Sequence, residues 1–268
     1  MPISDGAKCV NKIIEFETDD HLAIITLNRP EVMNALNPPL EHAIFEVFTT
    51  VRDDPSIWVV ILTGAGGRAF SAGNDLKWRS ENEDSIREFS VSRKDAFNHP
   101  EFGLWKPVIA AVDGYAVGGG LELAMACDVI VASDRSQFGL PEPRRGLMAD
   151  GGGVHGLPRI VPSKLAMEMI LTGALVDATR AKEIGFVNRV VASEHLLDEA
   201  KALATEMMEC SPKALQAAKQ TVILSGDTPY WDVLDIEYSM FKALKASGDF
   251  IEGPKAFSEK RKPVWEDA

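Results

Sequence analysis

Cysteine, basic side chains and long apolar runs are all scarce in this 268-residue sequence. Its three cysteines, Cys9, Cys127 and Cys210, are odd in number and widely spaced, which fits neither a disulfide framework nor a zinc site. Lysine and arginine total 28 against 40 acidic residues, so the net charge is -12 and a surface for nucleic acid or anionic membranes is not expected. No window approaches eighteen uninterrupted apolar residues, so no membrane-spanning helix is expected.

Targeting signals and metal ligands are also absent from the sequence pattern. The opening stretch MPISDGAKCVNKIIEFE lacks a cationic region followed by an apolar one, so no secretory signal is expected and a cytoplasmic location is the default. The five histidines, at positions 21, 42, 99, 155 and 195, are dispersed without the spacing of metal ligands. We therefore expect no bound metal.

Apolar residues make up 46% of the chain, and their order predicts alternating strands and helices. Two β-rich runs around the turn Asp19-Asp20 predict a hairpin that ends at Pro30, and apolar residues at helical spacing predict a helix over 38–53. Buried strands are expected at 58–64, 106–114 and 128–134, with a helical stretch over 77–103 near a pocket mouth and a short helix ending at Ala126.

This alternation predicts an α/β fold with largely parallel strands. After about residue 160 the apolar spacing becomes helical, and several of these segments end at a glycine that is typical of a helix C-terminus. No internal repeat or low-complexity linker interrupts the chain. We expect a long α/β region followed by a helical tail.

Three consecutive glycines at 118–120 precede Glu122 in the otherwise apolar stretch AVDGYAVGGGLELAMACD. Close packing of a helix on a strand, or a turn that needs positive φ, would by itself explain such a run. A second buried strand also ends in small residues before a carboxylate, in LTGAGGRAFSAGNDLK over 62–77. Backbone N–H groups from both places would form an oxyanion hole if they faced one oxygen, helped by the positive end of the following helix.

Three carboxylates stand beside these flexible segments: Glu122 in the first turn of the expected helix, Glu142 in FGLPEPRRG, and Asp150 before GGGVHG. Carboxylates on apolar elements beside flexible loops are typical of acid–base pairs with separated pKa values. Each also has a purely structural explanation, as a charge at a helix N-terminus, a surface-turn residue or a helix cap, respectively.

Taken together, these segments resemble the enoyl-CoA hydratase/isomerase family, the crotonases. The motifs are AFSAGNDL, KPVIAAVDGYAVGGGLELAMACD, FGLPE and GFVNRVV, and the likeness runs in order from LNRPEVMNAL to FSEKRKPVW. The resemblance implies a crotonase-type α/β spiral of ββα repeats that carries the active site at 1–200, and a helical C-terminal trimerisation region at 201–268. It also implies a homotrimer or a dimer of trimers, and a place in fatty acid metabolism.

The resemblance assigns roles to individual residues. Glu122 and Glu142 match the two catalytic glutamates of the hydratases, and the backbone N–H groups of Ala72 and Gly119 match the oxyanion-hole donors. Asp150 matches a position where some relatives carry a working aspartate, so it is an accessory candidate. Contacts with the CoA thioester are implied for Ala35, Ala72, Gly73, Asn74, Asp75, Leu76 and Gly119.

The implied activity is that of an enoyl-CoA hydratase, a hydro-lyase that adds or removes water across the 2,3 double bond of an acyl-CoA through an enolate. Glu122 would act as base at C3 and Glu142 as acid at C2, and no cofactor is needed because coenzyme A enters as part of the substrate. Two alternatives stay open: a dienoyl-CoA or enoyl-CoA isomerase using Glu142 and Asp150, and a non-catalytic CoA-binding scaffold. Retention of both glutamates favours the hydratase.

Other features bear on subgroup and substrate. The SAG-DLK, LTG and GFVNRVV segments lean toward the carnitinyl-CoA dehydratase-like subgroup, whereas no motif specifies the acyl group. Arg144 and Arg145 replace a usual apolar pair and are expected on a solvated surface, while Phe257 and Lys260 match positions that reach CoA from a neighbouring subunit. The candidate aromatic pocket walls are Trp78, Phe89, Phe97, Trp105, Tyr230 and Trp231.

Overall fold

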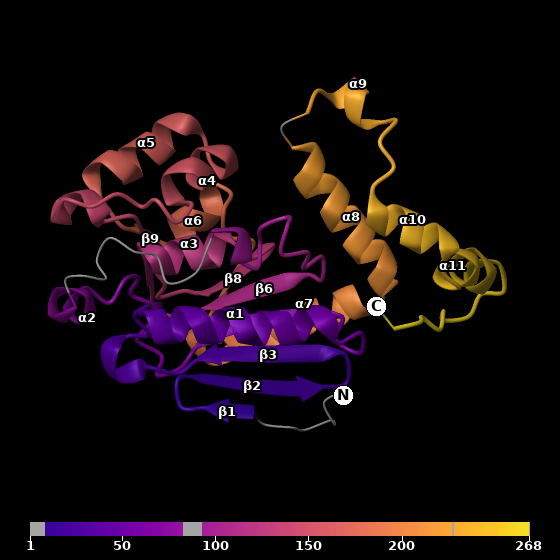
Figure 1. Ribbon diagram of the computed structural model, residues 1–268, viewed down its shortest axis with the longest axis horizontal. Helices are drawn as coiled ribbons and strands as arrows, with labels where there is room; N and C mark the ends of the chain where they lie inside the picture. Colours follow the sequence, from indigo (N-terminus) through magenta and orange to yellow (C-terminus); the bar gives the residue numbers. More distant parts are fainter. Residues whose placement is uncertain (1–8, 83–92, 227, 268) are drawn as a thin grey trace.

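The computed structural model describes residues 9–82, 93–226 and 228–267, and its strands form two sheets (Figure 1). The larger sheet has the order β1-β2-β3-β4-β6-β8-β11, and the smaller one has the order β10-β9-β7-β5. The strands of the larger sheet are β1 (Cys9–Asn11), β2 (Ile14–Asp19), β3 (Leu22–Leu27), β4 (Val59–Gly64), β6 (Val108–Val112), β8 (Val129–Ser133) and β11 (Arg189–Val191). Those of the smaller sheet are β5 (Ala69–Ser71), β7 (Tyr115–Val117), β9 (Gln137–Gly139) and β10 (Val176–Asp177).

Successive strands of the central region alternate between the two sheets. The strands β4, β6 and β8 are parallel neighbours in the larger sheet, and the strands that follow them, β5, β7 and β9, pair in parallel with one another in the smaller sheet. Helices α2 (Leu76–Glu81) and α3 (Gly119–Met125) follow the first two pairs, and η4 (Glu142–Arg145) with α4 (Gly153–Ile160) follows the third. The chain therefore winds as a spiral of ββα units, which confirms the predicted fold class.

The predicted hairpin and first helix are both present. Strands β2 and β3 pair in antiparallel register through a turn at Asp20, whose φ of 53° is in the left-handed region. Helix α1 (Pro38–Asp53) begins after Asn37, whose side chain accepts a hydrogen bond from the amide of Leu40 at 3.1 Å. This N-cap satisfies a backbone donor that the helix itself leaves without a partner.

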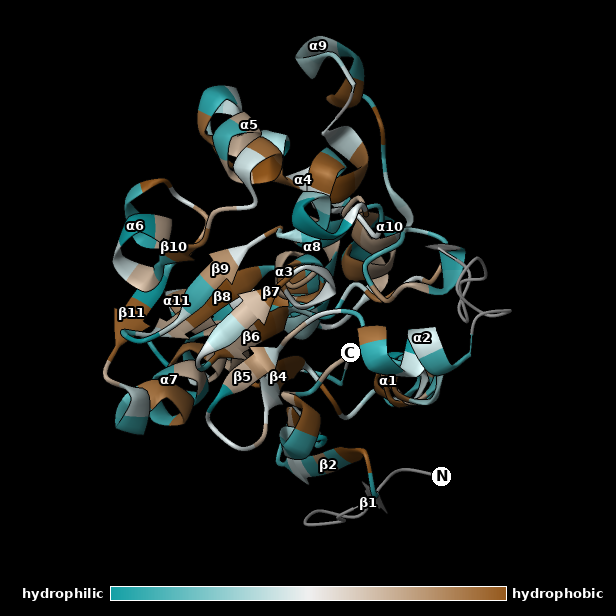
Figure 2. Cartoon of the chain, turned by 90° about the vertical axis from the view of Figure 1, so that its left-hand side faces the viewer, coloured by the Kyte–Doolittle hydropathy of each residue, from teal (hydrophilic) through white to brown (hydrophobic). Residues whose placement is uncertain are grey.

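The larger sheet is covered by helices on both faces, so its central strands are apolar at consecutive positions. In β4, Val60 and Leu62 pack in the cluster that contains the apolar face of α1. The intervening Val59 and Ile61 pack on the opposite face, against α7 (Leu196–Met208). Figure 2 shows these hydrophobic strands gathered at the centre of the molecule.

The region beyond residue 160 is mostly helical, as expected, but two short strands interrupt it. Strand β11 joins the larger sheet parallel to β8, and β10 pairs with β9 in the smaller sheet. The other helices among the described residues are η1 (Pro30–Val32), η3 (Arg93–Asp95), α5 (Ser163–Thr172), α6 (Ala178–Glu183), η5 (Ser193–His195), α8 (Pro212–Ser225), α9 (Tyr230–Val233), α10 (Ser239–Ala246) and α11 (Asp249–Ser258).

Helices α8 to α11 extend to one side of the two sheets (Figure 1). The predicted division between residues 200 and 201 falls inside α7, where Ala200 and Leu203 pack on the larger sheet. The division into two regions therefore stays a prediction. In the described parts of the chain, no helix has both the length and the apolar character that crossing a bilayer requires.

Candidate active site

A cavity of about 220 Å³ opens between α1 and α3. Helix α1 contributes Glu41, Ile44 and Phe45, which lie on one face of the helix because they are spaced by three and four residues. The same periodicity on α3 brings one face of that helix to the cavity. The other lining residues are Leu36, Asn74, Asp95, Ala96, Phe97, Asn98, Gly119, Glu122, Leu123, Ala126, Asp150 and Gly151. Several residues that the sequence singled out thus meet in one place.

The Glu122 carboxylate is held by the glycine run that follows Asp150. Its Oε1 accepts a hydrogen bond from the Gly153 amide at 2.8 Å, and the Gly151 amide also donates to this carboxylate. A Cβ at Gly151 would lie only 2.6 Å from Glu122 Oε2, so a side chain there would collide with the carboxylate. The contact between this glycine run and Glu122 cannot be read from the sequence, because the two are about thirty residues apart.

The pKa of Glu122 is raised to about 7, mainly because burial disfavours the charged form. The neighbouring charges of Glu142 and Asp150 act in the same direction, whereas the hydrogen bonds from the two glycine amides lower the pKa. Glu122 is therefore poised to exchange a proton near neutral pH, which is what a general acid or base requires.

Glu142 begins η4 and is buried against the glycine triplet. A Cβ at Gly118, where φ is 57°, would lie 2.7 Å from Glu142 Oε1, so both the backbone conformation and the close approach require glycine. Burial raises the pKa of Glu142, and the charge of Asp150 adds to this while Arg145 opposes it. Its Oε2 is buried and has no hydrogen-bond partner among the described residues, so a bound water or substrate would satisfy it.

Two backbone amides, those of Asn74 and Gly119, also belong to the cavity wall. The Leu36 amide donates to the Gly73 carbonyl at 2.8 Å, so the Asn74 N–H, on the other side of the same planar peptide, points away from Leu36. In the same way, the Gly118 carbonyl accepts from the Glu122 amide at 3.0 Å, so the Gly119 N–H points away from the body of α3. Within the part of the chain that the structure describes, neither amide donates to a protein acceptor.

The two amides lie close together because Gly73 packs directly against the glycine triplet. A Cβ at Gly73, where φ is 79°, would be 2.9 Å from the Gly119 nitrogen, and a Cβ at Gly119 would be 3.7 Å from the Asn74 nitrogen. Two N–H groups without acceptors, beside one another on a cavity wall, form an arrangement that can bind an oxygen carrying negative charge.

The sequence-based choice of Ala72 as an oxyanion-hole donor does not agree with this geometry. The Ala72 amide donates to the Met33 carbonyl at 2.9 Å, so it is already used inside the fold. Two residues later, the Asn74 amide lies on the cavity wall and has no acceptor among the described residues. Asn74, and not Ala72, therefore supplies the amide that lies beside Gly119 and is open to the cavity.

The remaining predicted thioester contacts cluster beside these amides. Leu36 and Asn74 form an isolated parallel bridge, which joins the turn containing Ala35 to the loop at 73–76. Asp75 caps α2 by accepting from the Trp78 amide at 3.0 Å, and Leu76 follows it with its side chain partly exposed. The loop at 73–76 is therefore held at one end by the bridge to Leu36 and at the other by the start of α2.

Some of the other residues that the sequence predicted for the site line this cavity, and others do not. Asp150 and Phe97 line it, whereas Phe257 on α11 is 87% exposed and Tyr230 and Trp231 lie on the surface of α9. Trp78 and Trp105 are not among the lining residues, and Phe89 lies outside the described residues. Arg144 is exposed, as expected, and donates to the Thr172 carbonyl at the end of α5.

No group of three or more His, Cys, Asp or Glu side chains in the described segments is arranged to hold a metal ion.

Comparison with known proteins agrees with the fold. The family Enoyl-CoA hydratase/isomerase matches residues 17–268. A carnitinyl-CoA dehydratase from Citrobacter koseri is 40% identical over 260 residues, covering 96% of this chain and 99% of the relative, and an (E)-benzylidenesuccinyl-CoA hydratase from Thauera aromatica is 38% identical over 255 residues, covering 95% and 99%. The crystal structure of an enoyl-CoA hydratase from Mycobacterium marinum superposes with a TM-score of 0.87 at 39% identity, covering 95% of this chain and 99% of that one.

The fold and the cavity therefore define a crotonase-type protein, in which the backbone amides of Asn74 and Gly119 lie near the carboxyl groups of Glu122 and Glu142. The chain belongs to the enoyl-CoA hydratase/isomerase family, as the resemblance of its motifs predicted. The relatives named above are hydratases and dehydratases of CoA thioesters.

Proposed function

We propose that the protein is an enoyl-CoA hydratase that adds water to, or removes it from, the 2,3 bond of an acyl-CoA thioester. One observation carries this proposal. The unpartnered amides of Asn74 and Gly119 line the same cavity as Glu122, and Glu142 packs against the adjacent Gly118. Donors for an oxyanion, together with one half-buried and one buried acid, are the groups that this chemistry needs.

The amides stabilise the charge that develops during the reaction. When water attacks C3 of the enoyl thioester, electrons move onto the thioester oxygen and an enolate forms. The Asn74 and Gly119 N–H groups donate to that oxygen, and each such fixed donor lowers the barrier by about 3 kcal/mol in comparable sites.

The two glutamates transfer the protons of one water molecule. Glu122, with a pKa of about 7, is substantially ionised at neutral pH and accepts a proton as the water oxygen bonds to C3. Glu142, whose pKa burial also raises, delivers a proton to C2 as the enolate collapses, and the proton taken up by Glu122 then passes to Glu142 through water, which restores the starting state. Because the two acids are neighbours, their titrations belong to the pair, and dehydration follows the same steps in reverse.

The lining of the cavity bears on the acyl group. It contains carboxylates besides Glu122, namely Glu41, Asp95 and Asp150, and no Lys, Arg or His among the described residues. This supports an acyl group without a negative charge, and the carnitinyl-CoA thioester named for several relatives is one candidate. Apolar contacts from Phe45 and Phe97 surround the rest of the acyl chain.

A second candidate function uses Asp150, which lines the cavity beside Glu122. If Asp150 and Glu142 exchange protons with carbon atoms instead of activating water, the protein is a dienoyl-CoA or enoyl-CoA isomerase. The product separates the two functions, because isomerisation incorporates no solvent oxygen.

The proposed function is tested by measuring turnover of a panel of trans-2-enoyl-CoA thioesters. Turnover is monitored as the loss of the absorbance of the conjugated thioester. Glu122→Gln and Glu142→Gln are each expected to lower kcat by about 10²- to 10⁴-fold. Glu41→Gln, in the same cavity, serves as a matched control and is expected to remain within tenfold of the native enzyme. Consumption of no 2-enoyl-CoA by the native protein would reject the hydratase, and consumption of a 3,5-dienoyl-CoA with gain of conjugation would support the isomerase.

A further inference from the structure

Arg29 lies beneath the loop that carries one of the two oxyanion-hole amides. Its side chain is 13% exposed and forms an ion pair with Asp75, which is 10% exposed, at 3.0 Å. Its other terminal nitrogen, Nη1, donates to the Ala35 carbonyl. The guanidinium thus joins the turn at 33–36 to the loop at 73–76.

A continuous line of hydrogen bonds leads from Arg29 to the cavity. The Ala35 carbonyl that accepts from Arg29 belongs to the same peptide group as the Leu36 N–H. That N–H donates to the Gly73 carbonyl at 2.8 Å, and the Gly73 carbonyl belongs to the same peptide group as the Asn74 N–H. Two peptide groups, aligned in the same direction, therefore stand between a cation and the donor that faces the cavity.

Such an alignment strengthens the last donor. Each hydrogen bond in a chain polarises the next, and a charged group at one end increases the effect in the low-dielectric interior of a protein. A positive charge at the Ala35 carbonyl draws electron density away from the Asn74 N–H. This N–H then binds an oxygen more tightly as that oxygen becomes negative, so the effect is largest in the transition state.

We propose that Arg29 is a positioning residue of the oxyanion hole, which acts by orienting and polarising the Asn74 amide through the Ala35–Leu36 and Gly73–Asn74 peptide groups. This proposal rests on the proposed function, because it takes the Asn74 amide as a donor to the thioester oxygen. Asp75 contributes by fixing the guanidinium from the other side. Its own amide donates to the Leu36 carbonyl at 2.8 Å, which keeps the two segments in register.

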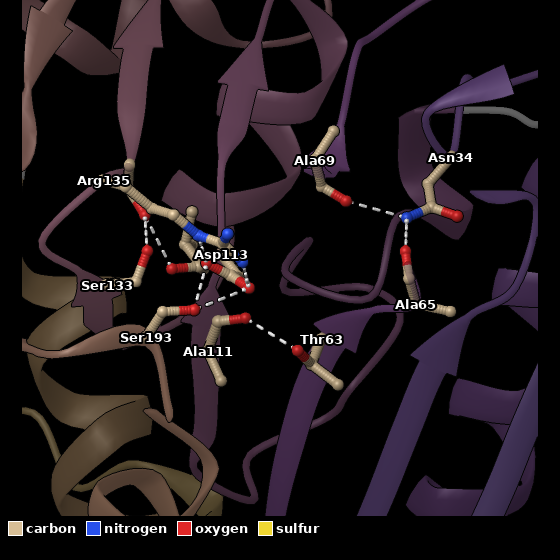
Figure 3. Close-up of polar contacts among 11 residues, drawn as sticks. Asn34, Thr63, Ala65, Ala69, Ala111, Asp113, Ser133, Arg135 and Ser193 are labelled. Atoms are coloured by element: carbon tan, nitrogen blue, oxygen red, sulfur yellow. Dashed lines mark hydrogen bonds and ion pairs between the residues drawn. The ribbon is translucent and has the colours of Figure 1, made fainter. Parts of the chain in front are cut away.

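The turn has a second anchor that does not involve the Arg29 side chain. Asn34 is fully buried, and its Nδ2 donates to the carbonyls of Ala65 at 3.0 Å and Ala69 at 2.8 Å (Figure 3). Its Oδ1 accepts from the Arg29 main-chain amide, a bond that any residue at position 29 except proline retains. A change of the Arg29 side chain therefore removes the cation while these bonds keep the turn in place.

The experiment uses Arg29→Met, which removes the charge, and Arg29→Lys, which keeps it but loses the forked geometry. The matched control is Arg135→Met, which breaks the ion pair with Asp113, a pair at the corner between β6 and β7 that does not line the cavity (Figure 3). For each protein we would measure kcat and KM for a 2-enoyl-CoA, and the absorption band of bound 4-dimethylaminocinnamoyl-CoA. This probe absorbs at longer wavelength when its thioester carbonyl is polarised, and the measurement requires binding but not turnover.

Arg29→Met is expected to lower kcat at least tenfold, to change KM by less than threefold, and to lose most of the red shift of the probe. Arg29→Lys, which preserves the charge opposite Asp75 and so preserves folding, is expected to show an intermediate kcat and an intermediate band. Arg135→Met should match the native protein in both readouts. The proposal would be overturned if Arg29→Lys had a native-like kcat and absorption band while Arg29→Met was either native-like or unfolded. It would also be overturned if the Arg29 variants changed KM and left kcat unchanged.

The two proposals fail in different ways. If the native protein hydrates no 2-enoyl-CoA but shifts the probe band in an Arg29-dependent manner, the hydratase is rejected and the role of Arg29 stands. If hydration proceeds and neither kcat nor the band depends on Arg29, only the positioning role is rejected.

Discussion

At the residue scale, the fold brings the protonation of Glu122 into the neutral pH range. Burial and the charges of Glu142 and Asp150 bring its pKa to about 7, against an ordinary value of 4.5. If Glu122 is the base, it must lose its proton before water attacks. We expect kcat/KM for hydration to rise with pH through an apparent pKa near 7. A pH–rate profile from pH 5.5 to 8.5 checks this, and an acid limb centred near 4.5 would contradict the assignment.

The same raised pKa makes Glu122 a source of pH-dependent instability. Between pH 4.5 and about 7 the folded state keeps a proton that the unfolded state has released, so the free energy of unfolding falls as pH rises through this window. The full effect, about 3 kcal/mol at most, is present above pH 7. Replacing Glu122 by glutamine removes it.

We therefore expect Glu122→Gln to gain stability relative to the native protein as pH rises from 5 to 8, by about 2 kcal/mol. Urea unfolding of both proteins at the two pH values measures the change, and Glu41→Gln provides a control from the same cavity. If the free energies of unfolding of the variant and the native protein differed by the same amount at both pH values, Glu122 would not be the source of the pH-dependent instability.

The residue scale is also where sequence reasoning was weakest. The motifs predict roles for Glu122 and Glu142, but the choice between Ala72 and Asn74 depends on which amide the Met33 carbonyl accepts from. That carbonyl is placed by a turn in which Met33 and Asn34 both have positive φ, at 54° and 53°. No local pattern in SAGND reveals a bond to a turn about forty residues away, so tertiary geometry decides this point.

At the element scale, the sequence predicted what has a long and consistent pattern. The apolar run of β4 and the helical apolar spacing of α1 are both visible in the sequence, because each element buries many of its residues in the core. Strands β10 and β11 were missed, since two or three residues are too few to show a period of two. Their place is set by pairing with β9 and β8 rather than by their own residues.

Helix α1 forms one wall of the cavity, so its N-terminal cap has a measurable role. The Asn37 side chain accepts from the Leu40 amide at the start of this helix, one residue before Glu41. Asn37→Ala is expected to lower the free energy of unfolding by about 1 kcal/mol. Urea denaturation measures this, with Thr50→Ala as a control on the exposed face of the same helix, expected to change stability by less than about 0.5 kcal/mol. A native-like stability of Asn37→Ala would show that the cap is dispensable.

At the scale of the whole molecule, the C-terminal helices leave large apolar side chains uncovered. Trp231, Ile251 and Phe257 are between 70% and 87% exposed in the single chain. Surfaces of this kind mark contacts with other proteins, and a second copy of the chain is the partner that the family resemblance predicts. The exposed side chains favour self-association, and a trimer or a dimer of trimers stays the prediction of the family resemblance.

We expect light scattering in solution to give a mass of about three or six times the 29.2 kDa of the chain. Ile251→Asp on α11 should lower that mass, because it places a charge in the contact, while the circular dichroism spectrum stays native. Lys262→Asp, also near the C-terminus and outside this apolar set, is the control. A native protein of 29.2 kDa at micromolar concentration would contradict the predicted assembly.

The most direct test of the whole account is a crystal structure of the protein with a saturated acyl-CoA, which binds but cannot be hydrated. The account predicts that the thioester oxygen lies about 2.7 to 3.1 Å from the amide nitrogens of both Asn74 and Gly119. It also predicts that Glu122 and Glu142 flank C2 and C3 of the acyl chain. A thioester oxygen bound away from these two amides would contradict the account. So would a structure in which Glu122 and Glu142 do not both face the acyl chain.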